Sequence, residues 1–133
     1  MSRNGDSSVL VVEDDPEINE LVGAYAKLAG FEYRPALDGT TALREAQARP
    51  PAAVVLDLML PDIDGFEVCQ RLKREPETRA VPVIMLTALS DAKNRQRGRE
   101  CGCCEYLTKP FDPDRLMEAL AEHTEPSRQR DLD

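Results

Sequence analysis

Long apolar runs are absent from this sequence of 133 residues. None of its runs approaches the roughly 20 consecutive apolar residues that a helix needs to cross a bilayer. The opening stretch, MSRNGDSSVL, also lacks the apolar segment of a secretory signal peptide. We therefore expect a protein that makes no use of a membrane, with the cytoplasm as its default location.

Basic charge is scarce as well. Lysine and arginine together number 17, against 25 aspartates and glutamates, which gives a formal net charge of -8 at pH 7. A domain this acidic is repelled by the phosphate backbone of nucleic acids. We therefore expect no direct nucleic-acid binding by this domain.

Ligands of the kind that zinc prefers are few. The only histidine is His123, and the cysteines are Cys69, Cys101, Cys103 and Cys104. The C-x-C-C spacing matches no common zinc pattern, in which ligand pairs stand about two to four residues apart and a second pair follows. Without a secretion signal, disulfides are not expected either. We predict that the thiols are reduced and serve as small apolar packing groups.

What the sequence does contain is an alternation of strand-like and helix-like segments within the length of one domain. The apolar runs lie at residues 9–12, 31–36, 53–56, 83–87 and 104–107. This order predicts a parallel sheet wrapped by helices, with Pro35 marking the second run as an edge strand. We expect the domain to fill residues 8–123, after a polar lead-in over 1–7 and before a polar tail or linker over 124–133.

Capping residues mark where most of the helices begin. Asp15 with Pro16 opens the first, Asp38 the second, and Asp112 with Pro113 the last. We expect one buried face on the first helix, formed by Ile18, Leu21, Val22, Tyr25, Leu28 and Ala29. The third helix is expected over residues 65–74, with inward side chains at Val68, Cys69 and Leu72.

The fourth helix, expected over residues 91–100, is almost entirely polar. Gly98 in its interior costs about 0.5–1 kcal/mol relative to alanine, and little apolar area remains for packing against a sheet. We expect this helix to be the least stable of the five. Its basic side chains form either a solvated face or a strip that steers an acidic partner: Lys93, Arg95, Arg97 and Arg99.

Polar residues collect where the predicted strands end. Glu13 and Asp14 follow the first strand, Asp57 follows the third, Thr87 ends the fourth and Lys109 follows the fifth. Because the carboxyl ends of parallel strands form the ligand-binding edge of such a sheet, these side chains should lie close together. Any one of them alone would be ordinary surface chemistry, but five in this order indicate a site.

Three carboxylates in one place repel one another unless a cation or protons neutralise them. Oxygen ligands select a hard cation such as Mg²⁺, which keeps several waters and is completed by phosphate oxygens. An aspartate beside such an ion can act as a nucleophile and form an aspartyl phosphate. Lys109 and Thr87 would then neutralise charge on the phosphoryl oxygens. We therefore interpret Asp57 as a phosphate acceptor with Mg²⁺ as cofactor.

With these residues in hand, the sequence resembles the response-regulator receiver domain of bacterial two-component signalling over roughly residues 8–123. The resemblance rests on four stretches, VLVVEDDP, VVLDLMLPDIDGFEV, VPVIMLTA and EYLTKPF. It implies a flavodoxin-like α/β fold: a single doubly wound sheet of five parallel strands in the order 2-1-3-4-5, with five helices. It also implies a cis bond between Lys109 and Pro110.

The same resemblance implies a role for each site residue. Asp57 is then the phosphorylated residue, and Thr87 and Lys109 are the catalytic hydroxyl and amine. The implied metal ligands are Glu13, Asp14, Asp57 and, through its backbone carbonyl, Met59. Thr87 and Tyr106 form the implied switch pair, in which the aromatic ring changes rotamer with the hydroxyl.

Partners follow from the resemblance too. A histidine kinase or a histidine phosphotransfer protein would donate the phosphoryl group. The face built from the fourth helix, fifth strand and fifth helix would pass the signal to a downstream protein or output domain, and it admits a homodimer on phosphorylation. Such a domain catalyses only its own phosphorylation and slow dephosphorylation, so we do not expect an enzyme in the ordinary sense.

Other interpretations fit the sequence less well. Phosphatases with an aspartate nucleophile carry a D-x-D motif at that residue. Here the tripeptide that begins at Asp57 is D-L-M, which lacks the second acid. A nucleotide-binding module of the flavodoxin type needs glycines and backbone amides after the first strand, where this chain has three acids. A degenerate receiver that acts only as a protein-binding module is an alternative, and the intact Asp57, Thr87 and Lys109 argue against it.

Overall fold

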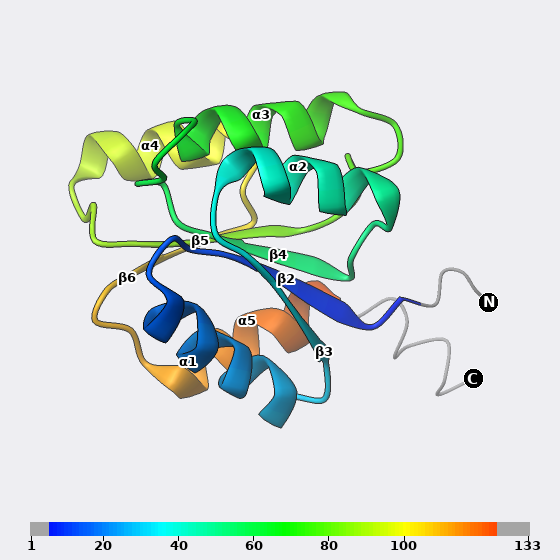
Figure 1. Cartoon of the computed structure of the whole chain (residues 1–133). Helices are drawn as coiled ribbons and strands as arrows, with labels where there is room; N and C mark the ends of the chain where they lie inside the picture. Colours follow the sequence, from blue (N-terminus) through cyan, green and yellow to red (C-terminus); the bar gives the residue numbers. More distant parts are fainter. Residues whose placement is uncertain (1–5, 125–133) are drawn as a thin grey trace.

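The computed structural model describes residues 6–124 (Figure 1). Residues 1–5 and 125–133, which hold most of the predicted lead-in and tail, lie outside this range. The strands are β2 (Ser8–Val12), β3 (Glu32–Ala36), β4 (Ala53–Leu56), β5 (Val83–Thr87) and β6 (Glu105–Thr108). The helices are α1 (Pro16–Leu28), α2 (Gly39–Ala48), α3 (Gly65–Arg74), α4 (Ala92–Cys101) and α5 (Pro113–His123).

The strands pair in parallel in the order β3-β2-β4-β5-β6. Counted along the chain this order is 2-1-3-4-5, so the predicted fold class is confirmed. β3 lies at an edge, where the missing amide of Pro35 costs no ladder hydrogen bond. The helix caps predicted at Asp15, Asp38 and Asp112 are also confirmed, because each carboxylate accepts a hydrogen bond from an amide of the helix that follows.

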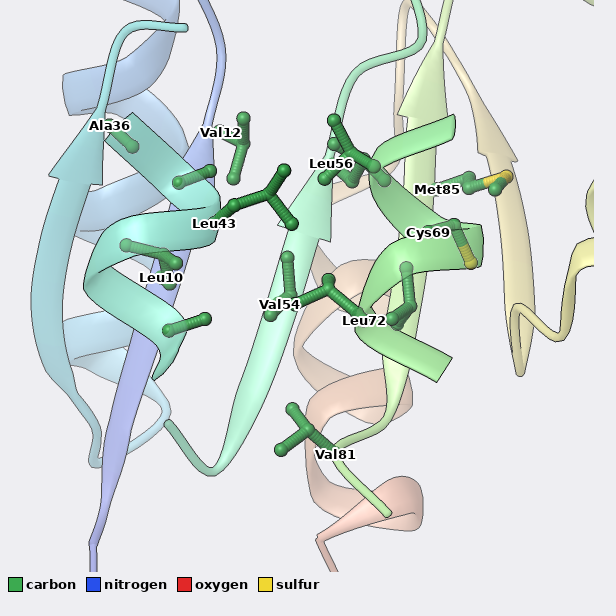
Figure 2. Close-up of a cluster of buried hydrophobic side chains, with 14 of the residues drawn as sticks. Leu10, Val12, Ala36, Leu43, Val54, Leu56, Cys69, Leu72, Val81 and Met85 are labelled. Atoms are coloured by element: carbon green, nitrogen blue, oxygen red, sulfur yellow. The ribbon is translucent and has the colours of Figure 1, made fainter. Parts of the chain in front are cut away.

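β2, β4 and β5 are buried along their whole length, because helices cover both faces of the sheet. Figure 1 shows α2, α3 and α4 on one face and α1 and α5 on the other. The core on the first face includes Leu10, Leu56, Leu72 and Met85 (Figure 2). Burying each side chain of this size contributes about 1.5–3 kcal/mol, so the two layers hold the strand ends firmly in register. In the described range, no helix is long and apolar enough to span a membrane.

The buried face of α1 matches the prediction only in part: Val22 is buried, and Ile18 and Tyr25 pack against the core, but two of the predicted leucines do not. Leu21 and Leu28 are 48% and 74% exposed, whereas the buried residues of α1 are Asn19, Val22, Gly23 and Ala26. The helix is therefore rotated relative to the face that its large apolar residues suggested. Its orientation follows instead from the hydrogen bonds of Asn19 and from the close approach of another side chain to Gly23.

Both contacts fix α1 at short range. The amide nitrogen of Asn19 lies 3.0 Å from the carbonyl oxygen of Glu13 and 3.1 Å from those of Val11 and Ala36. A Cβ at Gly23 would lie 2.5 Å from the ring of Tyr33, so only glycine admits that ring. A buried amide with its partners in place costs little, and here it ties the helix to the ends of two strands.

α4 packs through a glycine rather than through large side chains. Its only buried residues are Gly98 and Cys101. A Cβ on Gly98 would lie 2.9 Å from the Tyr106 ring and 3.0 Å from the sulfur of Met85. The missing side chain therefore lets the helix approach β5 and β6 closely, a role that the low helix propensity of glycine does not reveal.

Two arginines hold the flanks of α4. The guanidinium of Arg95 lies over the ring of Tyr106, 5.3 Å from its centre, and that of Arg97 lies 4.1 Å from the ring centre of Phe66. Cation–π contacts of this kind contribute about 0.5–1 kcal/mol each at exposed sites. These basic side chains thus contact the domain itself, and the lower stability of α4 stays a prediction.

All four cysteines carry free thiols. Cys69 and Cys101 are buried, as apolar packing groups should be, and Cys103 is half-buried against the same core. Cys104 is exposed as a residue, contrary to the packing prediction, because it stands just before the edge strand β6. Its sulfur nevertheless lies 3.4 Å from the carbonyl oxygen of Val83, to which the thiol donates.

Candidate functional site

The loop after β2 carries two of the predicted metal ligands. Its shape is set by Asp15, which caps α1, and by Asn19, whose amide binds the carbonyl of Glu13. The amide of Asp15 in turn donates to the Glu13 carboxylate at 2.9 Å. The Glu13 side chain is therefore held inward, and Glu13 is only 4% exposed, while Asp14 beside it is exposed.

Lys109 joins the acids of two different strand ends. Its ammonium lies 2.5 Å from Glu13 Oε1 and 2.9 Å from Asp57 Oδ2. Asp57 follows β4 and is 6% exposed. Lys109 follows β6, where its peptide bond to Pro110 is cis, as the family resemblance implied. In the sequence, Lys109 is 96 positions from Glu13 and 52 positions from Asp57. The parallel topology thus brings Lys109 into direct contact with both.

Glu13, Asp14 and Asp57 form a cluster at this edge of the sheet. One oxygen atom from each lies within 4.8 Å of the others. Three carboxylates against the single ammonium of Lys109 leave two negative charges uncompensated when all are ionised. A divalent cation with a preference for oxygen ligands fits both this charge and this donor set.

The pKa values of Glu13 and Lys109 reflect the same crowding. Burial raises the pKa of the Glu13 carboxyl, and the hydrogen bond from Lys109 offsets only part of that effect. Burial by itself would lower the pKa of Lys109, but hydrogen bonds to Glu13 and Asp57 outweigh it and raise that pKa. Lys109 is therefore charged at neutral pH and can serve as a fixed positive group.

Thr87 and Tyr106 lie on neighbouring strands and share a contact with one loop residue. Thr87, fully buried, accepts a hydrogen bond on its hydroxyl from the amide of Leu89 at 3.4 Å. The hydroxyl of Tyr106 donates to the carbonyl oxygen of Leu89 at 2.6 Å. The peptide groups of Leu89 therefore connect the predicted switch hydroxyl to the predicted switch aromatic.

Met59 lies in the loop that follows Asp57. Its amide donates to Asp57 Oδ1 at 3.2 Å, and Met59 is 57% exposed. Sequence reasoning missed Asn19 and Asp62, whose side chains organise the two loops of this edge. Neither stands out locally, because the sequence shows only an asparagine within a helix and one acid among several in a turn.

The fold and this edge together define a class of protein. A doubly wound parallel sheet normally binds its ligand beyond the carboxyl ends of the strands. Here that edge presents three acids and a lysine in place of glycine-rich phosphate loops. The class is therefore a flavodoxin-like α/β domain with an acidic edge suited to a divalent cation.

Comparison with known proteins narrows this class to one family. The family model described as the response regulator receiver domain matches residues 9–121. The transcriptional regulatory protein GltR of Pseudomonas aeruginosa is 43% identical over 118 residues, which cover 88% of this chain and 48% of GltR. The DNA-binding dual master transcriptional regulator RpaA of Synechocystis is 42% identical over 109 residues, 82% of this chain and 45% of RpaA.

Solved structures agree with the sequence relatives. A putative response regulator from Chloroflexus aurantiacus superposes with a TM-score of 0.84 at 34% identity, covering 90% of this chain and 98% of that one. The chemotaxis protein CheY4 of Vibrio cholerae gives a TM-score of 0.82 at 30% identity, covering 89% and 98%. The chain belongs to the response regulator receiver domains, the signal-receiving modules of two-component systems. It spans about half the length of the transcriptional regulators that it matches.

Proposed function

We propose that this domain accepts a phosphoryl group on Asp57 in a Mg²⁺-dependent reaction, and that a histidine kinase or histidine phosphotransfer protein donates it. The observation that carries the proposal is the Lys109 ammonium, which bridges the buried carboxylates of Glu13 and Asp57 beside Asp14. Asp57 can thereby act as the nucleophile, while Lys109 beside it supplies positive charge for the phosphoryl oxygens. The carboxylates around them supply negative charge for a metal ion. Membership of the receiver family supports the same chemistry.

In the proposed step, a carboxylate oxygen of Asp57 forms a bond to phosphorus while the bond from phosphorus to the donor's imidazole nitrogen breaks. The imidazole takes up a proton as it leaves. Lys109 shifts part of its hydrogen bonding from Asp57 to a phosphoryl oxygen and stabilises the charge there. Glu13, Asp14, Asp57 and the carbonyl of Met59 would hold Mg²⁺, which supplies further positive charge to the transferring group.

The proposed switch runs from Thr87 to Tyr106. The Thr87 hydroxyl can donate a hydrogen bond to a phosphoryl oxygen, and turning toward that oxygen would move the hydroxyl away from the amide of Leu89. Because Tyr106 binds the carbonyl of Leu89, a shift of this residue would reach the ring and Arg95 stacked on it. We propose that the face built from α4, β6 and α5 carries this change to a downstream protein or output domain, with a homodimer of phosphorylated copies as one form of output.

The extent and setting of the domain are part of the same proposal. Residues 8–123 would form the receiver unit, with residues 124–133 as a tail or linker. The relatives described as transcriptional regulators are longer than the matched segment, and in this chain the net charge of -8 argues against contact between DNA and the receiver unit itself.

Four free thiols suit the reducing cytoplasm. We do not count a domain that turns over only its own phosphoryl group as an enzyme.

Intact-mass measurement after incubation with acetyl phosphate and Mg²⁺ tests the phosphorylation site. The wild-type protein should gain one phosphoryl group, and Asp57→Ala should gain none. Asp114→Ala, a change to an exposed acid in the first turn of α5, should behave like wild type. Undiminished adduct formation in Asp57→Ala would show that the acceptor is another residue.

Calorimetric titration with Mg²⁺ tests the metal ligands. Asp14 is exposed, so Asp14→Asn should fold normally while binding Mg²⁺ much more weakly than wild type, because one fewer charged oxygen faces the ion. Equal affinity of the two proteins would mean that the ligands are assigned wrongly.

A further inference from the structure

The loop between β4 and α3 is fastened to a helix that takes no part in the proposed chemistry. Asp62, at the tip of this loop, accepts hydrogen bonds from the first amides of α2: Gly39 to Oδ1 at 2.8 Å and Thr40 to Oδ2 at 2.9 Å. The Thr40 hydroxyl donates to the same carboxylate at 2.7 Å. One side chain thus closes the amino end of a helix 23 residues earlier in the chain.

This contact is stronger than an ordinary surface hydrogen bond. The carboxylate is ionised, it uses both oxygens, and it faces the positive end of the helix dipole. The hydrogen bond from Thr40, followed by those from the backbone amides, holds the pKa of Asp62 well below its usual range. Asp62 therefore keeps its negative charge, and its hydrogen bonds to the first turn of α2, throughout the physiological pH range.

A second contact beside Asp62 brings loop and helix still closer. A Cβ on Gly39 would lie 2.6 Å from the Ile63 side chain, so glycine is what lets Ile63 lie against the first turn of α2. Ile63 also packs against the core beneath. The tip of the loop is therefore fixed to α2 by one polar and one apolar contact.

The base of the loop is closed as well. The amide of Gly65 donates to the carbonyl of Leu58 at 3.0 Å, and a Cβ on Gly65 would lie 2.5 Å from the Cα of Leu58. Residues 59–64 thus form a short closed loop that is pinned at its base and at its tip. Met59 lies inside it, and its exposed side chain offers little packing to hold it in place.

We propose that Asp62 is a positioning residue for the metal site: its grip on α2 fixes the backbone of the loop, and with it the carbonyl of Met59. This inference rests on the proposed function, in which that carbonyl binds Mg²⁺. Freed at its tip, the loop would sample more conformations, and Mg²⁺ binding would then have to restrict them at a cost in affinity. α2 supplies none of the proposed metal ligands, but through Asp62 it would support the loop that carries one of them.

A simple cap would explain the hydrogen bonds but not an effect on metal binding, so the experiment separates the two roles. Asp38 caps the same helix from its own chain segment, accepting from the Thr41 amide at 2.7 Å, and it does not touch the loop through that bond. Asp38→Ala and Asp62→Ala each remove a cap from α2, but only the second frees the loop. Asp62→Asn, which keeps one acceptor oxygen, serves where the alanine variant folds poorly.

Two measurements are made on each variant: Mg²⁺ affinity by calorimetry, and hydrogen exchange of residues 58–64. Asp62→Ala should bind Mg²⁺ roughly 10-fold more weakly, a loss typical of groups that orient metal ligands, and its loop amides should exchange faster. Asp62→Asn should show a smaller loss, and Asp38→Ala should match wild type in both measurements.

Wild-type affinity in Asp62→Ala, or an equal loss in Asp38→Ala, would overturn the positioning role while leaving the proposed function intact. A wild-type protein that binds no Mg²⁺ at all would instead overturn the proposed function, and the inference with it.

Discussion

Replacing Gly98 with alanine tests how α4 is held against the sheet. In an isolated helix this change would stabilise by up to about 1 kcal/mol, because glycine is the less favourable helix residue. In the folded protein the new methyl group would meet the Tyr106 ring at 2.9 Å and the sulfur of Met85 at 3.0 Å. Both distances are well inside the roughly 3.5–4.0 Å at which such atoms attract one another.

Neither neighbour gives way easily. Met85 is fully buried in β5, and the Tyr106 ring is tied by its hydroxyl to the carbonyl of Leu89 and covered by Arg95. Overpacking of this kind typically costs about 1–3 kcal/mol. Set against the gain in helix propensity, the net destabilisation of Gly98→Ala should be about 1 kcal/mol, which lowers Tm by about 4 °C in a domain of this size.

Urea unfolding followed by circular dichroism measures the effect. The control is Gln96→Ala, a change on the exposed side of the same helix, which should stay within about 0.5 kcal/mol of wild type. In a Tyr106→Ala background, Gly98→Ala should lose part of its cost, because the clash with the ring is gone while the clash with Met85 remains. A Gly98→Ala protein more stable than wild type would refute the argument, since it would show that the glycine is not needed for close approach.

Three further predictions concern the site, the thiols and α4. Met59→Asn combined with Leu89→Glu should speed loss of the phosphoryl group, because polar side chains at these positions can orient a water molecule; an unchanged lifetime in a timed mass measurement would count against this. Burial of the sulfur raises the pKa of Cys104 to about 11, so little thiolate forms at neutral pH. Its alkylation should therefore be much slower than that of free cysteine at pH 8 and should rise as the pH approaches 11; a rate equal to that of free cysteine would contradict the covered sulfur. Amides of residues 92–101 should exchange with solvent faster than those of α1, and equal protection would show that α4 is as firmly held as the rest.

The strands and helix caps could be predicted because their signals are local. An apolar run bounded by turns and an aspartate followed by proline carry their meaning within a few residues, as at Asp15 and Pro16. The meeting of Glu13, Asp57 and Lys109 was also predictable, although they are far apart in sequence. It follows from the general rule that the carboxyl ends of parallel strands share one edge.

The inward position of Asn19 on α1, and the exposure of two of its leucines, were beyond such reasoning. The count of apolar residues favoured Leu21 and Leu28, but the helix turns Asn19 inward because three carbonyl oxygens and the Tyr33 hydroxyl satisfy its amide. Those partners come from two strands and a loop, so no window along the sequence contains them. The hold of Asp62 on α2 escaped notice for the same reason, since it joins segments that become neighbours only after folding.

The sparse packing of α4 has a consequence for how this domain could change over time. Gly98 and Cys101 are the only buried residues of the helix, while Lys93, Gln96, Arg99 and Glu100 on its outer side are exposed. Substitutions at those outer positions can therefore accumulate without disturbing the acidic edge or the core. A receiver built this way can change the outer surface of one helix through a handful of substitutions, while its acidic edge stays as it was.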